Sequence, residues 1–356
     1  MPVPVPGESF TSWVDAVARD SRCYPNQLVV DAWRLRKSRT ASMARLDAGL
    51  TGRELQQIHA ATGIRAEVLN GMRLARYTDQ PLPALADLQD EWHAGALSFI
   101  RDRFLLRDHS RWCPLCLKES NGRWYLRWKS AWSYACTDHE VFLSAVCPTC
   151  YEPQDWIRAG PADRRLFCPG RRFHDSISVR RSSRCSHPLT EVPSTPVTDP
   201  VLLSIQKSID YGFEGSPTVQ PGARSALRLF LFPLLVDLIL KFRSPDMFHD
   251  ADPAIASANE EGASQSPSLS QGPTAYYDVA HPLLVAGAIH LGFRLVTGES
   301  RHAASEQFVE LAYGKIVKHG RAWGSEPEYL PWHQRQLLPP RLSEMLMDRG
   351  VIRDSL

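Results

Sequence analysis

The chain has 356 residues, of which 43% are hydrophobic and 22% are charged, and its formal net charge at neutral pH is +2. This length predicts two or three domains, and the composition is that of a folded protein, which excludes a disordered or fibrous chain. The net charge is too small to indicate a nucleic-acid partner by itself.

The beginning of the chain has neither a basic nor an apolar signal segment, so no secretion signal is visible. The most apolar stretch, Leu229 to Leu240, contains Pro233 and Asp237 and is shorter than the roughly 20 residues that cross a bilayer. We interpret it as a buried helix or helix pair. Clustered cysteines at metal-binding spacing favour a reducing compartment, so we expect a cytoplasmic protein with no membrane partner.

Residues 1–112 are predicted to form an N-terminal helical domain, because apolar residues from Phe10 to Ala18 recur at helical spacing. Within it, residues 52–72 have the pattern of two short helices. Leu55 and Ile58 give the first helix an apolar face, and Gly63 supplies a left-handed turn. This pattern predicts a helix-turn-helix element.

Such an element binds DNA in some proteins and serves only packing or a protein partner in others, and the sequence leaves both readings open. In the DNA-binding reading, Arg65 and Asn70 face the bases of a major groove and Arg73 contacts phosphates.

Four residues in the middle of the chain have the spacing C-x2-C-x19-C-x2-H: Cys113, Cys116, Cys136 and His139. Thiolate and imidazole bind zinc tightly, and two intervening residues let a tight turn direct both ligands of a pair at one ion. An isolated pair would also fit a redox dithiol or buried apolar cysteines, but a second pair follows here. We therefore predict a structural zinc site.

A second zinc ion is predicted from the next cysteines, Cys147, Cys150, Cys168 and Cys185. The first three are the stronger candidates. Cys185 is our choice for the fourth ligand, and His187 and His174 are alternatives. Cys23 lies outside this cluster and is interpreted as a small core residue in a helical segment.

Four protein ligands leave no open position for water, so the first site is predicted to be structural rather than catalytic. The chain also lacks the H-x-E signature of zinc deaminases, a H-E-x-x-H helix, a G-x-S-x-G elbow and a phosphate-binding loop. We expect no enzymatic activity.

The aromatic and basic residues between 123 and 134 are open to two interpretations. Trp124, Trp128 and Trp132 are four residues apart, which on a helix makes one stripe. Aromatic and basic side chains in alternation can also stack nucleic-acid bases. We favour a stripe that covers the small core beside the metal.

Positive charge is concentrated between residues 161 and 190, where seven arginines stand against two aspartates, a balance of 7 − 2 = +5. This segment is either a solvated basic loop or a phosphate-binding surface. The candidates for contact with nucleic acid are Arg171, Arg172, Arg180 and Arg181.

The predicted zinc module therefore covers residues 113–190, and helical segments follow it. Residues 191–250 are predicted to be helical, through 201–209 and 226–242. Residues 251–275, rich in Ala, Ser, Gln, Gly and Pro, are predicted to be a flexible linker. A C-terminal helical domain is predicted over residues 276–356.

The motifs in their order along the chain resemble those of the TniQ family of transposition target-selection proteins. They are Pro6-Gly7-Glu8-Ser9 with Trp13 close behind, the hairpin around Thr62-Gly63, Cys113-Pro114-x-Cys116, Cys136-x-x-His139 and Cys147-Pro148-x-Cys150. The resemblance covers roughly residues 6 to 190. Beyond that, only the helical character is shared.

The resemblance implies a mostly α fold in which helical domains with helix-turn-helix elements flank a tandem zinc-ribbon module. It implies zinc ligands at the first six positions above, from Cys113 to Cys150. Cys168 and Cys185 depart from the family pattern, because 16 residues separate them where a ribbon has a close pair.

The family resemblance also implies a role without transposase activity. Some relatives read an attachment site in DNA, and others form homodimers on a guide-RNA effector complex and recruit an AAA+ ATPase that activates the transposase. We therefore expect a target-selection adaptor. Its rivals are a zinc-containing DNA-binding transcriptional regulator and an enzyme that acts on nucleic acid.

Overall fold

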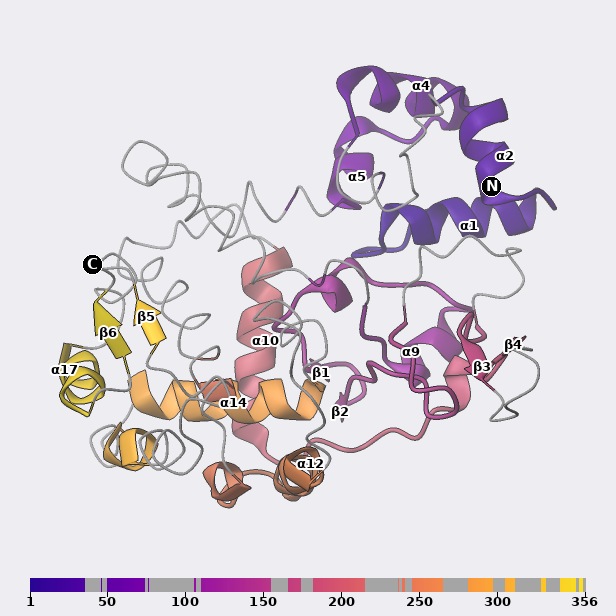
Figure 1. Ribbon diagram of the computed structural model, residues 1–356. Helices are drawn as coiled ribbons and strands as arrows, with labels where there is room; N and C mark the ends of the chain where they lie inside the picture. The colour runs from indigo at the N-terminus through magenta and orange to yellow at the C-terminus, as the bar shows by residue number, and fades with distance from the viewer. Residues whose placement is uncertain are drawn as a thin grey trace. The chain divides into compact units, whose positions relative to one another are not determined.

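The structure is a computed structural model. It describes residues 1–35, 50–73, 110–154, 166–173, 182–214, 245–264, 281–296, 305–310, 328–330, 340–349 and 352–354, with the single residues 46, 76, 106, 236, 239 and 240. These residues divide into two compact units. The first holds the described residues up to Pro196 together with 203–214, and the second holds 197–202 and those from 236 onward. Helices predominate in the part of the chain that is described (Figure 1).

The N-terminal part of the first unit is helical, as predicted. Its elements are α1 (Phe10–Asp20), α2 (Pro25–Gln27), the π-helical turn η1 (Leu28–Ala32), α4 (Gly52–Thr62) and α5 (Ala66–Gly71). Phe10, Trp13, Trp33, Ile58 and Leu69 belong to their common core, because the apolar stripe of each helix faces the others. Figure 1 shows these helices in indigo and violet.

Local signals in the sequence fix the ends of α4. Thr51 accepts a hydrogen bond from the amide of Glu54, and the Glu54 carboxylate accepts one from the amide of Thr51, which is a capping box. At the other end, Gly63 has φ = 72°, a left-handed conformation that glycine adopts without strain. The predicted pair of short helices with a glycine turn is therefore present.

Small elements build the middle of the chain. They are α9 (Pro114–Glu119), the 3-10 helix η2 (Leu126–Lys129), β1 (Ala135–Cys136), β2 (Val141–Phe142), β3 (Arg171–Phe173), β4 (Ser182–Arg184) and the 3-10 helix η4 (Leu189–Glu191). β1 pairs with β2 and β3 pairs with β4, both antiparallel. The short strands form two hairpins instead of one extended sheet.

The predicted tryptophan stripe lies in the core, but the predicted helix was wrong. Trp124, Trp128 and Trp132 are at most 4% exposed, whereas only the short η2 is helical in this segment. The backbone donors here bind distant partners: the amide of Leu126 donates to the carbonyl of Gly7, and the amide of Trp124 donates to the Ser12 hydroxyl. These long-range hydrogen bonds take the place of the i to i−4 hydrogen bonds of a helix.

The predicted boundary at residue 112 does not separate two independent folds. Ser110 pairs with Gln154 and Trp112 with Ser144 in isolated β-bridges, so the residues before Cys113 already belong to the metal-binding module. The buried Arg111 guanidinium also donates to the carbonyl of Ser133.

Helix α10 (Pro200–Glu214) confirms the helix predicted over 201–209. In the first unit, its fully buried Gln206 accepts hydrogen bonds from the amides of Tyr134 and Ala135, beside β1. The Gln206 amide group donates to Asp210 on the same helix. This polar contact holds α10 against the metal-binding module.

The second unit contains η5 (Pro245–Phe248), α12 (Pro253–Ser264), α14 (Pro282–Val296), α17 (Pro340–Asp348) and the parallel strands β5 (Glu328–Leu330) and β6 (Ile352–Asp354). The flexible linker predicted over residues 251–275 was wrong as far as residue 264, because residues 253–264 form helix α12. Residues 265–275 lie outside the described part of the chain. Gly287 of α14 lies so close to α12 that a β-carbon there would be 2.8 Å from Ile255. The predicted helix over 226–242 lies almost wholly outside the description.

Within the described residues, no helix combines the length and apolar character that a bilayer span requires.

Candidate metal centres

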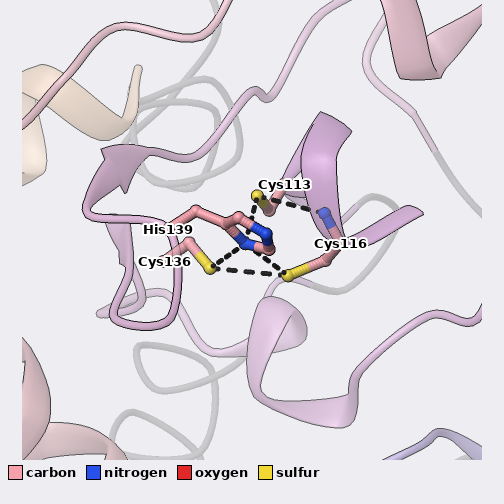
Figure 2. A group of neighbouring side chains, drawn as sticks. All are labelled: Cys113, Cys116, Cys136 and His139. Atoms are coloured by element: carbon pink, nitrogen blue, oxygen red, sulfur yellow. Dashed lines mark hydrogen bonds between the residues drawn. The ribbon is translucent and has the colours of Figure 1, made fainter. Parts of the chain in front are cut away.

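The first predicted ligand set comes together in space. Cys113 precedes α9 and Cys116 lies in its first turn, whereas Cys136 ends β1 and His139 lies in the turn between β1 and β2. Each pair is thus supplied by one tight local structure. Figure 2 shows the three sulfur atoms and one imidazole nitrogen facing a common centre.

The distances between these atoms fit the edges of a tetrahedron around one ion. His139 Nδ1 lies 3.7 Å from the sulfur of Cys113, 3.3 Å from that of Cys116 and 3.5 Å from that of Cys136. Zinc at its usual bond lengths would set such edges at about 3.5 Å between nitrogen and sulfur. The Cys116 and Cys136 sulfurs are 3.5 Å apart, against about 3.8 Å expected around zinc. The donor set therefore fits a metal ion of the zinc type.

A carboxylate outside the ligand set orients the imidazole. Glu119 Oε1 lies 3.0 Å from His139 Nε2, so the ring donates its Nε2 proton to Glu119 and leaves Nδ1 free to bind a metal. Carboxylates commonly support metal-binding histidines in this way. Glu119 follows Cys116 by three residues on α9, a spacing that could have identified it from the sequence.

The second set also converges. The sulfurs of Cys147, Cys150, Cys168 and Cys185 all lie within 4.8 Å of one another. The Cys147 and Cys185 sulfurs are 3.7 Å apart, and those of Cys150 and Cys168 are 3.5 Å apart. These separations also fit a tetrahedral sulfur site.

Cys185 lies with Cys147, Cys150 and Cys168 in this cluster. His187 instead places its Nδ1 3.0 Å from the hydroxyl of Thr149, inside the Cys147 to Cys150 turn. His174 lies outside the described residues.

Three donors that sequence reasoning missed surround the second cluster. Gln154 Nε2 donates to the Cys168 sulfur at 3.2 Å, and the amide of Gly170 donates to the same sulfur at 3.3 Å. The amide of Thr149 donates to the Cys147 sulfur at 3.5 Å. Such hydrogen bonds stabilise thiolates and so favour metal binding. Gly170 and Gln154 carried no recognisable signal in the sequence.

The pKa values of the cysteine thiols differ between the two clusters. Burial raises the pKa of Cys150 to about 11, and it raises the pKa of Cys168 as well. In the first set, hydrogen bonds from Cys113 and Cys116 lower the pKa of Cys136. A dication would supply the positive charge that several ionised thiols in one small volume require.

The described residues among the predicted nucleic-acid contacts lie at the α4–α5 hairpin and on β3. Arg65 is exposed at the start of α5, but the Arg73 guanidinium donates to the carbonyl of Leu50 and to the side chain of Asn70. Arg73 and Asn70 therefore help to hold the hairpin together. Arg171 and Arg172 lie on β3, and Arg180 and Arg181 are outside the described residues.

These features define a mostly helical protein with two buried Cys/His clusters that could each hold a metal ion. The model of the TniQ family matches residues 1–143, a range that contains the first cluster. Over these residues the chain is similar to the TniQ family. No curated protein matches the chain.

Proposed function

We propose that the protein is a non-catalytic target-selection adaptor in DNA transposition. It would link an element that recognises the target, either a guide-RNA effector complex or a DNA site, to an AAA+ ATPase regulator and its transposase. The observation that carries this proposal is the TniQ match over residues 1–143. The match favours transposition over the alternative of a transcriptional regulator.

The metal clusters support a role for surfaces rather than chemistry. Each cluster offers four protein donors to one ion, so an ion bound by all four would have no open position for a substrate. We propose that two zinc ions hold the described residues between 110 and 192 in the shape that partners recognise. Because the two clusters are largely buried, their metals would act through the fold.

Co-purification tests the adaptor role. The full-length chain should bind the AAA+ regulator encoded beside it and, where the neighbouring genes include one, a guide-RNA effector complex. Cys116→Ser should abolish this binding by unfolding the module, whereas Cys23→Ser, outside both clusters, should not. A chain that binds a DNA site but no effector would indicate direct DNA reading. A chain that binds no ATPase would contradict the adaptor role.

A further inference from the structure

Each metal cluster has one ligand that is only partly buried. In the first cluster this ligand is His139, whose side chain is 16% exposed, and the three cysteines are at most 5% exposed. In the second cluster it is Cys150, and the other three cysteines are again at most 5% exposed. The two clusters therefore differ in the type of residue that a reactant in solution can approach.

This difference decides which cluster a peroxide can oxidise. The reaction of a cysteine with a peroxide depends on its thiolate character and its exposure, and an imidazole has no sulfur to oxidise. The partly exposed ligand of the first cluster is thus inert in this chemistry, and its Nε2 is held by Glu119. Cys150, by contrast, lies between the partly buried Thr149 and the exposed Tyr151. A peroxide should reach a ligand sulfur first in the second cluster.

The charge of the ligand sets adds to this difference. In the first cluster three thiolates and a neutral imidazole would surround a dication, which leaves one net negative charge. In the second cluster four thiolates would leave two. The more negative set keeps more electron density on its sulfurs, and an electron-rich sulfur is the nucleophile in the attack on a peroxide. Charge and exposure therefore favour oxidation of the same cluster.

A second thiol lies where it can complete the oxidation. The sulfur of Cys168 is 3.5 Å from that of Cys150, and a disulfide brings two sulfurs to about 2 Å. Gly170 lies against both sulfurs, since a β-carbon there would be 2.8 Å from the first and 3.2 Å from the second. Because Gly170 has no side chain, nothing at this position keeps the two sulfurs apart.

We infer that the second cluster is a peroxide-reactive modification site, in which a hydroperoxide oxidises Cys150 and Cys168 to a disulfide. With hydrogen peroxide, the Cys150 sulfur attacks one oxygen, the O–O bond breaks, and hydroxide leaves and takes up a proton. The Cys168 sulfur then attacks the sulfenic acid, so that an S–S bond forms, the S–O bond breaks and a second hydroxide is protonated. Two thiolates, one peroxide and two protons give one disulfide and two waters, and two electrons pass from sulfur to oxygen.

The disulfide would remove two of the four ligands, so this cluster would release its metal. Strand β3 begins three residues after Cys168, and β4 ends directly before Cys185, so the β3–β4 hairpin would lose its anchor at both ends. The first cluster would keep its metal. The inference goes beyond the proposed adaptor function, because it applies to any role in which the chain binds zinc.

Zinc release from the full chain tests the inference. The chain is purified with a reductant, freed of it and treated with hydrogen peroxide, while a chromogenic chelator reports released zinc against a sample without peroxide. The zinc of the second cluster should leave roughly tenfold faster than that of the first. Alkylation and peptide mapping should find the Cys150–Cys168 disulfide first, and a dithiol with added zinc should restore the second ion.

Cys150→His gives the second cluster the ligand types of the first and removes the reactive sulfur. Native mass spectrometry should still count two ions, and both should leave at the slow rate of the first cluster. Cys23→Ser is the matched control, because Cys23 is also partly exposed but lies outside both clusters, and it should behave like the natural chain.

Several results would overturn the inference. They are release of both ions at one rate, a first disulfide between any other two cysteines, and a natural chain that holds no second ion. Undiminished sensitivity of a two-zinc Cys150→His chain would do the same. If this variant fails to hold its second ion, the order of oxidation mapped on the natural chain decides. Selective release in a chain that binds no ATPase would sustain the inference and contradict the adaptor role.

Discussion

The Glu8 carboxylate and the Arg123 guanidinium form a buried ion pair that joins the N-terminal helices to the metal-binding module. Arg123 NH1 lies 2.8 Å from each carboxylate oxygen, and Glu8 is fully buried. Glu8 also accepts a hydrogen bond from the Ser12 hydroxyl, which in turn accepts one from the amide of Trp124. The Pro6 to Ser9 motif thus has a structural role: it docks the start of the chain on residues 123–126.

Replacement of Glu8 with glutamine should lower stability strongly, because Arg123 would keep its charge in a largely buried place without a counter-ion. The loss of a buried partner costs about 3–5 kcal/mol. Urea unfolding followed by tryptophan fluorescence measures the change. Glu310→Gln, which removes a pair in which both side chains are about half exposed, should change stability by less than about 1 kcal/mol. Similar effects of the two substitutions would contradict a structural role for the Glu8 pair.

The sequence predicted local features better than long-range ones. The first cluster and the α4–α5 hairpin follow from short spacings, since each ligand pair or glycine turn is built by adjacent residues. The contact between Glu8 and Arg123 spans 115 positions and has no local signature. The tryptophan segment was misread for the same reason: its backbone amides bind distant partners, which periodicity does not reveal.

Composition misled the interpretation of residues 251–264. The small and polar residues predicted a linker, but alanine has the strongest helix propensity, and Asp252 accepts a hydrogen bond from the amide of Ala254 at the start of α12. Ile255 then anchors the helix against α14. The sequence left three candidates for the fourth ligand of the second cluster: Cys185, His187 and His174. Cys185 is far from Cys147 and Cys150 in the sequence, so no local spacing links it to them.

Removal of metal should unfold the described residues between 110 and 192 and leave the packing of α12 on α14 intact. Small modules of this kind depend on their metal because their cores are too small to fold alone. Native mass spectrometry should show two zinc ions per chain before chelation, and hydrogen exchange should then show loss of protection in β1 and α9. Cys116→Ser should remove one ion and unfold the same region. A metal-free chain with full protection there would contradict the prediction.

Substitution of Gly170 by alanine should eliminate the second metal and spare the first. A β-carbon at this position would lie 2.8 Å from the Cys150 sulfur and 3.2 Å from the Cys168 sulfur, so the ligands would have to separate. Native mass spectrometry should find one zinc in this variant. Gly71→Ala is the control, because a β-carbon there meets nothing within 4 Å. Two tightly held ions in the Gly170 variant would show that the cluster does not need this space.

The stability of the second unit should decrease at acid pH because of Asp252. Its carboxylate, 5% exposed, accepts bonds from the hydroxyl and amide of Thr198 at 2.6 and 2.9 Å. Burial alone would raise the pKa of Asp252, but these bonds outweigh it and hold the pKa below the ordinary 3.8. The charged form therefore stabilises the fold above pH 3.8, and this contribution is lost as pH falls through the lower, folded value.

Thr198→Val removes one donor to that carboxylate and should cost about 1.5–3 kcal/mol at pH 7. The difference from the natural chain should shrink between pH 7 and an acid pH below the lowered pKa of Asp252, where the carboxylate is protonated in both proteins. Urea unfolding at the two pH values measures it, and any loss of metal in acid affects both chains alike. Ser208→Ala, which alters an exposed hydroxyl on α10, should have little effect at either pH. If the loss of unfolding free energy in Thr198→Val is the same at both pH values, the hydroxyl does not act through the charge of Asp252.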